Sequence, residues 1–154
     1  MHLSQLAAAN PDKPAYIMAG SGQTFTYSDL ERGSNQLAQL FRSLGLVRGD
    51  HIAILLENHP LFIQICVAAQ RAGLYYTAIS YRLQSEEVAY IVNDCGAKVF
   101  ITSKDRQMVV EALLPDLSEL DQAFMLDGVI AGFESLEDVM ATDRKSTRLN
   151  SSHQ

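Results

Sequence analysis

The clearest pattern of apolar and polar positions lies between Pro60 and Tyr81. Apolar residues recur there at the spacing of one helix face, at Leu61, Ile65, Ala68 and Ala72. Pro60 suits the first helical position, where its missing N–H has no partner to lose. Gly73 stands where a left-handed residue ends a helix, and the β-prone apolar residues 74–79 follow. A helix that leads directly into a buried strand is half of a βαβ unit, so this stretch predicts a parallel α/β sheet.

The alternation of helix and strand patterns continues on both sides of this stretch. Residues 51–56 form an apolar run without alternation, as expected of a parallel strand covered on both faces. The other expected strands are residues 74–79, 98–102 and 123–126, and the expected helices are residues 3–9, 28–44, 60–72, 85–95, 105–114 and 136–140. We therefore expect an α/β fold with a doubly wound parallel sheet and right-handed crossovers.

The region before this unit predicts a small hairpin. Residues 15–18 and 24–26 are its expected strands, and Gly20 and Gly22 relieve the steric cost of its turn. We interpret this lone G-x-G as a turn rather than a phosphate loop, because no strand–G-x-G-x-x-G–helix context follows.

Two helix starts carry capping signals. Ser28 and Glu31 have the spacing of a capping box, in which each side chain accepts a hydrogen bond from the other residue's backbone N–H. Ser85 is the expected N-cap of the helix over residues 85–95. Glu86 and Glu87 then fall in its first turn, where the helix dipole favours carboxylates.

Length and composition narrow the class of protein. A chain of 154 residues predicts one domain, and 47% hydrophobic with 19% charged residues excludes disorder and a coiled coil. The net charge of −6 disfavours a broad nucleic-acid-binding face. No secretory signal opens the chain, and no apolar run approaches the ~18 residues of a membrane span. We interpret Cys66 and Cys95 as free thiols, with a disulfide or metal site as the alternative, and expect a cytoplasmic location.

Five residues with chemically active side chains are candidates by residue type and position. His51 and His59 are acid–base candidates, but a strand start and a helix cap favour surface or capping roles. Glu57 follows a strand, where open α/β sheets bind ligands, although a phosphoacceptor site would need several acidic residues there. Lys98 and Lys104 are interpreted as isolated, solvated charges.

Three tyrosines are candidates for lining an acyl pocket. Tyr75, Tyr76 and Tyr81 lie in or just after the strand over residues 74–79. Aromatic residues in such a run are more often part of the core, and we favour that interpretation. The sequence thus predicts no catalytic, cofactor-binding or metal-ligating residue.

The last twelve residues, DRKSTRLNSSHQ, differ in character from the rest. They are basic and lack apolar periodicity, so they cannot add to a core. A disordered basic tail is one interpretation. We prefer another, since the string resembles translated sequencing adapter at the end of a truncated protein. On this basis residues 1–142 are expected to be a partial N-terminal subdomain and residues 143–154 a disordered, non-native tail.

Residues 3–103 together resemble the N-terminal part of the adenylate-forming, AMP-binding acyl-CoA synthetase family. The resemblance is carried by T-Y-S-D-L, then G-D-H-I-A-I-L-L, then A-G-L-Y-Y-T-A-I-S with E-E-V-A-Y-I-V-N-D-C-G-A-K, in that order. G-L-Y-Y-T-A-I-S is most similar to fatty or aryl acyl-CoA ligases. One departure is Ala78, at a position where the family's Y-x-P segment often has proline.

The resemblance implies a two-step reaction in the parent enzyme. A carboxylic acid attacks the α-phosphorus of ATP to give an acyl-adenylate and pyrophosphate, and the CoA thiol then displaces AMP. ATP, Mg²⁺ and CoA are the implied cofactors, and no nucleic acid or membrane span is implied. The family's Ser/Thr/Gly-rich phosphate loop with its lysine, its Y-G-x-T-E-like segment and its Y-x-T-G-D-like segment have no counterpart in this sequence. We therefore expect the chain to be inactive alone and to bind none of these cofactors.

Two alternatives remain open from the sequence. One is an adenylation unit that loads a carrier-protein thiol instead of CoA. The other is a self-sufficient α/β module that binds a nucleotide or a partner without chemistry. A ligase gene continues in frame beyond residue 142, whereas a self-sufficient module has its own stop codon and unfolds cooperatively.

Overall fold

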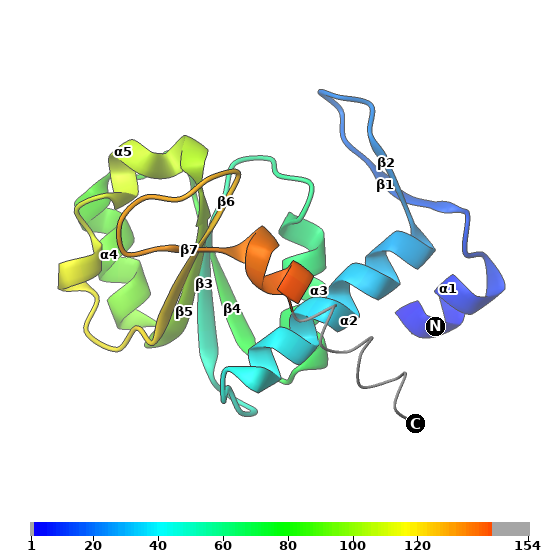
Figure 1. The fold of residues 1–154 in the computed structure, drawn as a ribbon, viewed down its shortest axis with the longest axis horizontal. Coiled ribbons are helices and arrows are strands. Elements are labelled where there is room, and N and C mark those ends of the chain that lie inside the picture. The colour runs from blue at the N-terminus through cyan, green and yellow to red at the C-terminus, as the bar shows by residue number, and fades with distance from the viewer. Residues whose placement is uncertain (1, 143–154) are drawn as a thin grey trace.

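The computed structural model describes residues 2–142 (Figure 1). The chain begins with α1 (Leu3–Ala9) and an antiparallel hairpin of β1 (Pro14–Ile17) and β2 (Thr24–Thr26), as predicted. Helix α2 (Tyr27–Ser43) follows without a break and leads to the main sheet. The hypothesis about residues 143–154 falls outside the described part of the chain. Within that part, no helix is both long and apolar enough to cross a membrane.

The main sheet has five parallel strands in the order β4-β3-β5-β6-β7. Its strands are β3 (His51–Leu55), β4 (Tyr75–Ile79), β5 (Ala97–Ser103), β6 (Gln122–Leu126) and the two-residue β7 (Glu134–Ser135). The first four strands were predicted to within two residues at each end. Strand β7 was not, because two residues carry no periodicity.

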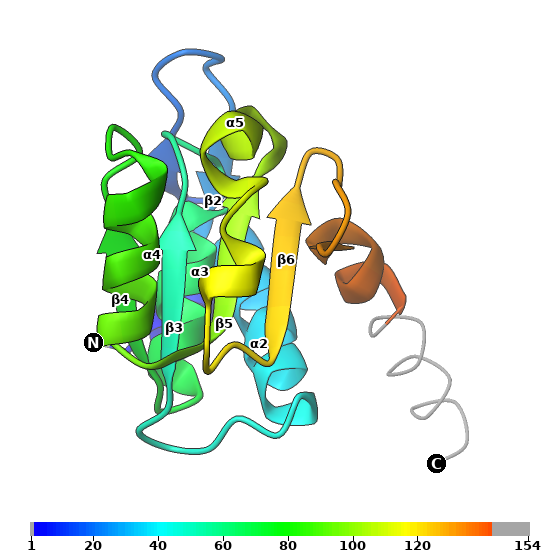
Figure 2. The same ribbon diagram turned by 90° about the vertical axis from the view of Figure 1, so that its left-hand side faces the viewer.

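Helices cover both faces of this sheet, which confirms the predicted doubly wound arrangement. Helices α2 and α3 (Phe62–Arg71) lie on one face, and α4 (Ser85–Asp94) and α5 (Gln107–Val110) lie on the other (Figure 1). Figure 2, turned by 90°, shows α4 and α5 in front of the strands and α2 behind them. Two apolar cores result, one on each side of the sheet.

Strand β3 is the centre of both cores. Ile52 and Ile54 point into the core under α2 and α3, whereas Ala53 and Leu55 point into the core under α4 and α5. All four side chains are fully buried. Because a strand alternates its side chains between two faces, burial on both sides requires an unbroken apolar run. This is the run that the sequence shows.

The start of α2 differs from its prediction. Thr26, rather than Ser28, is the N-cap: its Oγ1 accepts from the N–H of Asp29 at 3.1 Å, while the Asp29 carboxylate accepts from the N–H of Thr26 at 2.9 Å. Thr26 keeps the extended backbone of β2 (φ −83°, ψ 168°), whereas Ser28 is already helical. The hairpin therefore decides where the helix begins, and a local S-x-x-E spacing could not reveal that.

Two further helices begin at residues other than the predicted ones. Gln84, rather than Ser85, is the N-cap of α4, because Ser85 donates from Oγ to the carbonyl oxygen of Val109 at 2.6 Å. Glu86 and Glu87 do occupy the first turn as expected. Helix α3 begins at Phe62, so Pro60 lies in the preceding turn rather than at the first helical position.

The remaining differences lie after β5. The helix expected over residues 105–114 is broken into a 3₁₀ turn (Lys104–Arg106), the one-turn α5 and a second 3₁₀ turn (Leu114–Asp116). Residues 136–142 are helical, close to the expected 136–140.

Gly73 follows the end of α3 with φ +75°, as its position predicts.

Removing the N-cap of α2 tests the corrected capping assignment. We expect Thr26→Ala to lower the free energy of unfolding by about 1 kcal/mol, because the N–H of Asp29 loses its acceptor. Ser28→Ala is the matched control and should change stability by less than about 0.5 kcal/mol. Urea denaturation followed by circular dichroism measures both. Equal losses in the two variants would contradict the assignment.

The same cap predicts a pH dependence. Hydrogen bonding from the N–H of Thr26, aided by the hydroxyl of Thr26 and by Arg32, lowers the pKa of Asp29 in the folded chain. A lowered folded pKa contributes stability above the unfolded value of about 3.9, and this stability is lost as the pH falls through the folded value. The stability difference between the native chain and Asp29→Asn should therefore shrink below about pH 4. Urea denaturation at a series of pH values measures this, and a constant difference would refute it.

Candidate functional site at the carboxyl edge of the sheet

The carboxyl ends of the parallel strands meet at one edge of the sheet, where two crossovers diverge. The chain leaves β3 toward β4 through α3, and it leaves β5 toward β6 in the opposite direction. Ligands of open α/β sheets bind in the crevice at such a reversal of strand order. A ligand-binding site is therefore expected at this edge.

Two side chains of β5 tie the strand ends together at this reversal. Thr102 donates from Oγ1 to the carbonyl oxygen of Leu55 at 2.8 Å. Ser103 donates from Oγ to Oε1 of Glu57 at 2.6 Å. Both hydroxyl residues are fully buried. Glu57 thus lies where the sequence places it, and its carboxylate joins β3 to β5.

His59 connects two loops at the same edge. Its Nδ1 accepts from the N–H of Leu61 at 3.1 Å, and its Nε2 lies 2.9 Å from Oδ2 of Asp127. Because Nδ1 is an acceptor, the hydrogen of the neutral ring lies on Nε2 and is donated to the Asp127 carboxylate. Asp127 has a positive φ of 65°, and its N–H donates to Glu137. The His59 side chain is only 8% exposed, so it is not at the surface, and it bonds the N–H of Leu61 in the turn before α3 rather than a helical N–H.

A basic corner lies at the carboxyl ends of β4 and β5. The guanidinium carbons of Arg82 and Arg106 lie 5.6 Å and 5.4 Å from the centre of the Tyr81 ring. Arg106 also donates to the carbonyl oxygen of Tyr81 at 2.9 Å and pairs with Asp105. The aromatic ring holds both cations through its negative face. We call Tyr81, Arg82 and Arg106 the basic corner.

One donor of the basic corner has no acceptor. Nε of Arg106 is buried and makes no hydrogen bond within the described residues. A buried N–H without a partner costs roughly 1–3 kcal/mol. Lys104 adds a third cation nearby in the chain, with its stem against Gly128. The corner thus gathers three cations, of which Arg106 is paired with Asp105.

The sequence did not single out Arg82 and Arg106. Each arginine follows the end of a strand by a few residues, and this position is the signal that could have identified it. Helix α4 separates the two strands in the sequence, so the sequence does not show that the two arginines lie together. Tyr81 was a candidate, and it lies 42% exposed between the two arginines rather than in the core.

The other tyrosines are not in the core either. Tyr75 is 63% exposed and Tyr76 is 37% exposed, so the favoured interpretation of this aromatic run was wrong. The reason is that β4 is an edge strand, which sequence periodicity does not reveal. Tyr75 stacks on His51, with ring centres 5.1 Å apart, at the opposite, amino edge of the sheet. Neither residue contacts the basic corner.

Lys98 and the cysteines complete the sequence candidates. Lys98 is not isolated, because its Nζ lies 3.2 Å from Oδ1 of Asp50 and so ties the starts of β5 and β3. Cys66 and Cys95 are free, as predicted, and burial raises the pKa of the Cys66 thiol. Among residues 2–142, no three His, Cys, Asp or Glu side chains are grouped to hold a metal ion.

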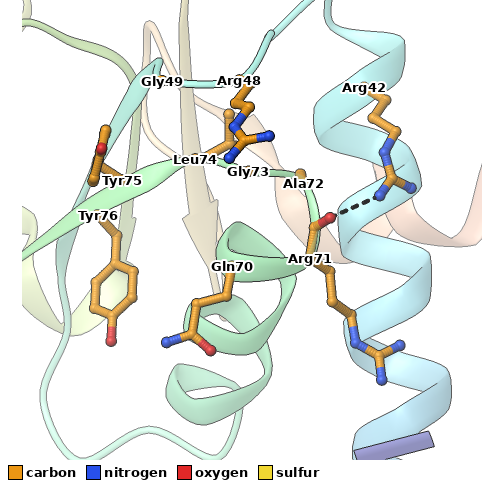
Figure 3. A pocket seen from close by; sticks show the side chains of 10 residues that line it. All are labelled: Arg42, Arg48, Gly49, Gln70, Arg71, Ala72, Gly73, Leu74, Tyr75 and Tyr76. Atoms are coloured by element: carbon orange, nitrogen blue, oxygen red, sulfur yellow. Dashed lines mark hydrogen bonds between the residues drawn. The ribbon is translucent and has the colours of Figure 1, made fainter. Parts of the chain in front are cut away.

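A hollow of about 900 Å³ lies at the amino edge (Figure 3). Its lining includes Arg42, Arg48 and Arg71 together with Tyr75 and Tyr76. Arg42 donates to the carbonyl oxygen of Arg71 at 3.0 Å, at the end of α3. Cations at this position stabilise helix carboxyl ends, whose dipoles disfavour a bound anion. Arg42 therefore has a structural role at the end of α3.

Comparison with known proteins shows the family to which the chain belongs. The sequence model described as AMP-binding enzyme matches residues 3–149. The chain belongs to the AMP-binding enzyme family. The match covers the whole described fold and extends past Thr142.

Two relatives and one solved structure illustrate the similarity. Crotonobetaine/carnitine–CoA ligase of Proteus mirabilis (strain HI4320) is 33% identical over 133 residues, covering 81% of the chain and 26% of the relative. Human long-chain fatty acid transport protein 1 is 35% identical over 91 residues, covering 59% of the chain and 14% of the relative. The structure of a Mycobacterium tuberculosis fatty acyl CoA synthetase superimposes with a TM-score of 0.79 at 25% identity, covering 91% of the chain and 27% of that structure. The chain thus spans about a quarter or less of each relative.

Substitution of His59 tests its bridging role. We expect His59→Ala to lower the free energy of unfolding by about 1–3 kcal/mol, since the N–H of Leu61 loses its acceptor. His59→Asn should lose less, because an asparagine oxygen accepts from a backbone N–H two residues on. Thermal or urea denaturation ranks the variants. Equal stability of His59→Ala and the native chain would contradict the role.

Proposed function

We propose that this chain is the amino-terminal α/β part of an ATP-dependent acyl-CoA synthetase. The whole enzyme joins a fatty or aryl carboxylate to CoA through an acyl-adenylate, with release of AMP and pyrophosphate. The family match over residues 3–149 carries the proposal, and the relatives named as CoA ligases support it. The chain alone is inactive, because the sequence lacks the family's phosphate loop and lysine.

In this proposal the described residues contribute a scaffold and one ligand contact. ATP and CoA supply the activating phosphates and the acceptor thiol, with Mg²⁺ bound by residues outside this chain. Arg106 and Arg82 hold a phosphate group of ATP or of CoA at the carboxyl edge. The two arginines that share the Tyr81 ring are the observation that supports this contact. The free cysteines suit a reducing, cytoplasmic location.

Residues 143–154 are proposed to be a non-native end because of their basic, aperiodic character, although the family match continues to residue 149. Sequencing the source DNA through the Thr142 codon tests this. A frame that continues into a Ser/Thr/Gly-rich loop with a lysine supports the ligase. A confirmed stop after DRKSTRLNSSHQ in intact genomic DNA contradicts it and leaves a non-catalytic module.

The reaction is tested with the product of the continued gene. We expect it to form AMP and pyrophosphate from ATP when a fatty or aryl acid and CoA are present, while the 154-residue chain forms none. Transfer to a carrier-protein thiol but not to CoA would replace the proposal with the adenylation-unit alternative.

The phosphate contact has its own test in that enzyme. Arg106→Ala should raise the KM for either ATP or CoA by roughly tenfold or more with a smaller change in kcat, since a charged hydrogen bond is lost. Arg32→Ala is the matched control, because Arg32 pairs with Asp29 on α2, far along the chain from the corner. Unchanged KM values for both substrates would refute the contact and leave the family reaction intact.

A further inference from the structure

The hairpin of β1 and β2 lies at the carboxyl end of the main sheet (Figure 2). It forms a two-stranded sheet of its own, so it adds no strand to the main one. Tyr16 and Phe25 face each other across the hairpin, and their rings stack with centres 4.7 Å apart. A stacked cross-strand pair holds both rings in one orientation, so the Tyr16 hydroxyl has a defined direction.

That hydroxyl reaches residues 57–60, which form the loop between β3 and α3. It donates to the carbonyl oxygen of Pro60 at 2.8 Å and accepts from Nε2 of Gln64 at 3.3 Å. Burial raises the pKa of Tyr16 above its usual range, so the hydroxyl keeps its proton and remains a donor. Because 44 residues separate Tyr16 from Pro60, this is a tertiary contact rather than a local turn.

The Gln64 side chain has little freedom to move. Gln64 is only 5% exposed, and a Cβ atom on Gly33 of α2 would overlap its Oε1. Glycine at position 33 therefore leaves the room that this amide occupies. The Tyr16 hydroxyl is thus held from two sides, by a confined amide donor and by a backbone acceptor.

The loop over residues 57–60 is fastened at two further points. Glu57 accepts from the buried Ser103 of β5, and His59 bonds to Asp127 in the turn after β6. Two fixed points leave a loop free to rotate about the line between them, and the hairpin contact removes that rotation. All three contacts lie within the described chain, so they do not depend on what else covers its surface.

We propose that Tyr16 is a positioning residue: through the carbonyl group of Pro60, the hairpin sets the β3–α3 loop at the ligand-binding edge of the sheet. This loop leaves β3 at the reversal of strand order, beside the segment after β5 that carries Arg106. The position of the loop is a property of this chain, whereas its use by a ligand rests on the proposed function. A loop that is ordered before the ligand arrives loses less conformational entropy on binding.

Amide hydrogen exchange of the 154-residue chain tests the positioning. Tyr16→Phe keeps the ring stack and removes the hydroxyl. We expect the N–H groups of Leu61 and Phe62 to exchange roughly three- to tenfold faster, because one hydrogen bond no longer holds the loop. The N–H groups of β3 should exchange as in the native chain. Tyr27→Phe is the matched control and should change neither set, since the Tyr27 hydroxyl makes no hydrogen bond within residues 2–142.

The nitrogen chemical shifts of the His59 ring separate positioning from a general loss of stability. In the native chain Nδ1 accepts from the N–H of Leu61, and Nε2 lies against the Asp127 carboxylate. When the loop moves in Tyr16→Phe, we expect both shifts to move toward the averaged values of a free neutral imidazole. His51 stacks on a tyrosine at the opposite edge of the sheet, so its shifts are the internal control and should stay constant.

Three results would overturn the positioning role. One is unchanged exchange at Leu61 and Phe62 together with unchanged His59 shifts in Tyr16→Phe. Another is an equal change in the Tyr27→Phe control. The third is faster exchange throughout β3, which would show a loss of global stability instead of a local release.

Kinetics of the whole enzyme test the use of the loop. We expect Tyr16→Phe to raise the KM for ATP or for CoA severalfold and to leave kcat within about twofold, because binding rather than the chemical step depends on the loop. The affected KM should be the one that Arg106→Ala raises, since both residues act at the same edge. An unchanged KM, or a fall in kcat alone, would overturn the link to binding. A native enzyme that forms no acyl-CoA would contradict the proposed function, whereas the exchange result stands on the chain itself.

Discussion

The fold depends on burying both faces of one short strand. Four of the five side chains of strand β3 are fully buried, namely those of Ile52, Ala53, Ile54 and Leu55. Each face needs its own helix layer, so the chain must cross the sheet on alternate sides. That requirement produces the divergence of crossovers at the end of β3, and with it the carboxyl edge where Glu57 and Ser103 meet. The strand order and the position of the candidate site thus share one physical cause.

The sequence predicted those parts of the fold that depend on local periodicity. The apolar run at residues 51–56 and the positive φ expected of Gly73 both hold in the structure. The errors arose where a distant contact overrides a local signal. Ser28 lost the cap of α2 to Thr26 because a hairpin strand ends there, and Ser85 lost that of α4 because its hydroxyl reaches Val109. The contact of Ser85 with Val109 is not visible locally, whereas Thr26 and Asp29 do have capping-box spacing, so the sequence offered two overlapping boxes for α2.

The candidate site was less predictable than the fold. Glu57 was a candidate because it follows a strand, and His59 because its imidazole can act as an acid or a base. Their hydrogen bonds hold the loops of that edge. Arg82 and Arg106 were missed, because what makes them notable is a shared aromatic ring. The error over Tyr75 and Tyr76 has the same origin, since composition cannot distinguish an edge strand from a central one. Predicting these residues required the spatial order of the strands, which the sequence alone does not show.

The strand order also has a consequence for synthesis of the chain. Of the two neighbours of β3 in the sheet, β4 comes first along the chain. The other neighbour, β5, follows later, and its Ala97 aligns with His51. A ribosome that has released residues only as far as α4 has made a strand pair whose inner edge still lacks its partner. Such a nascent intermediate exposes an unpaired edge of β3, and long-range pairing of this kind is slow and prone to aggregation. The central place of β3, which stabilises the finished fold, thus leaves the unfinished chain with an exposed strand edge until β5 has been made.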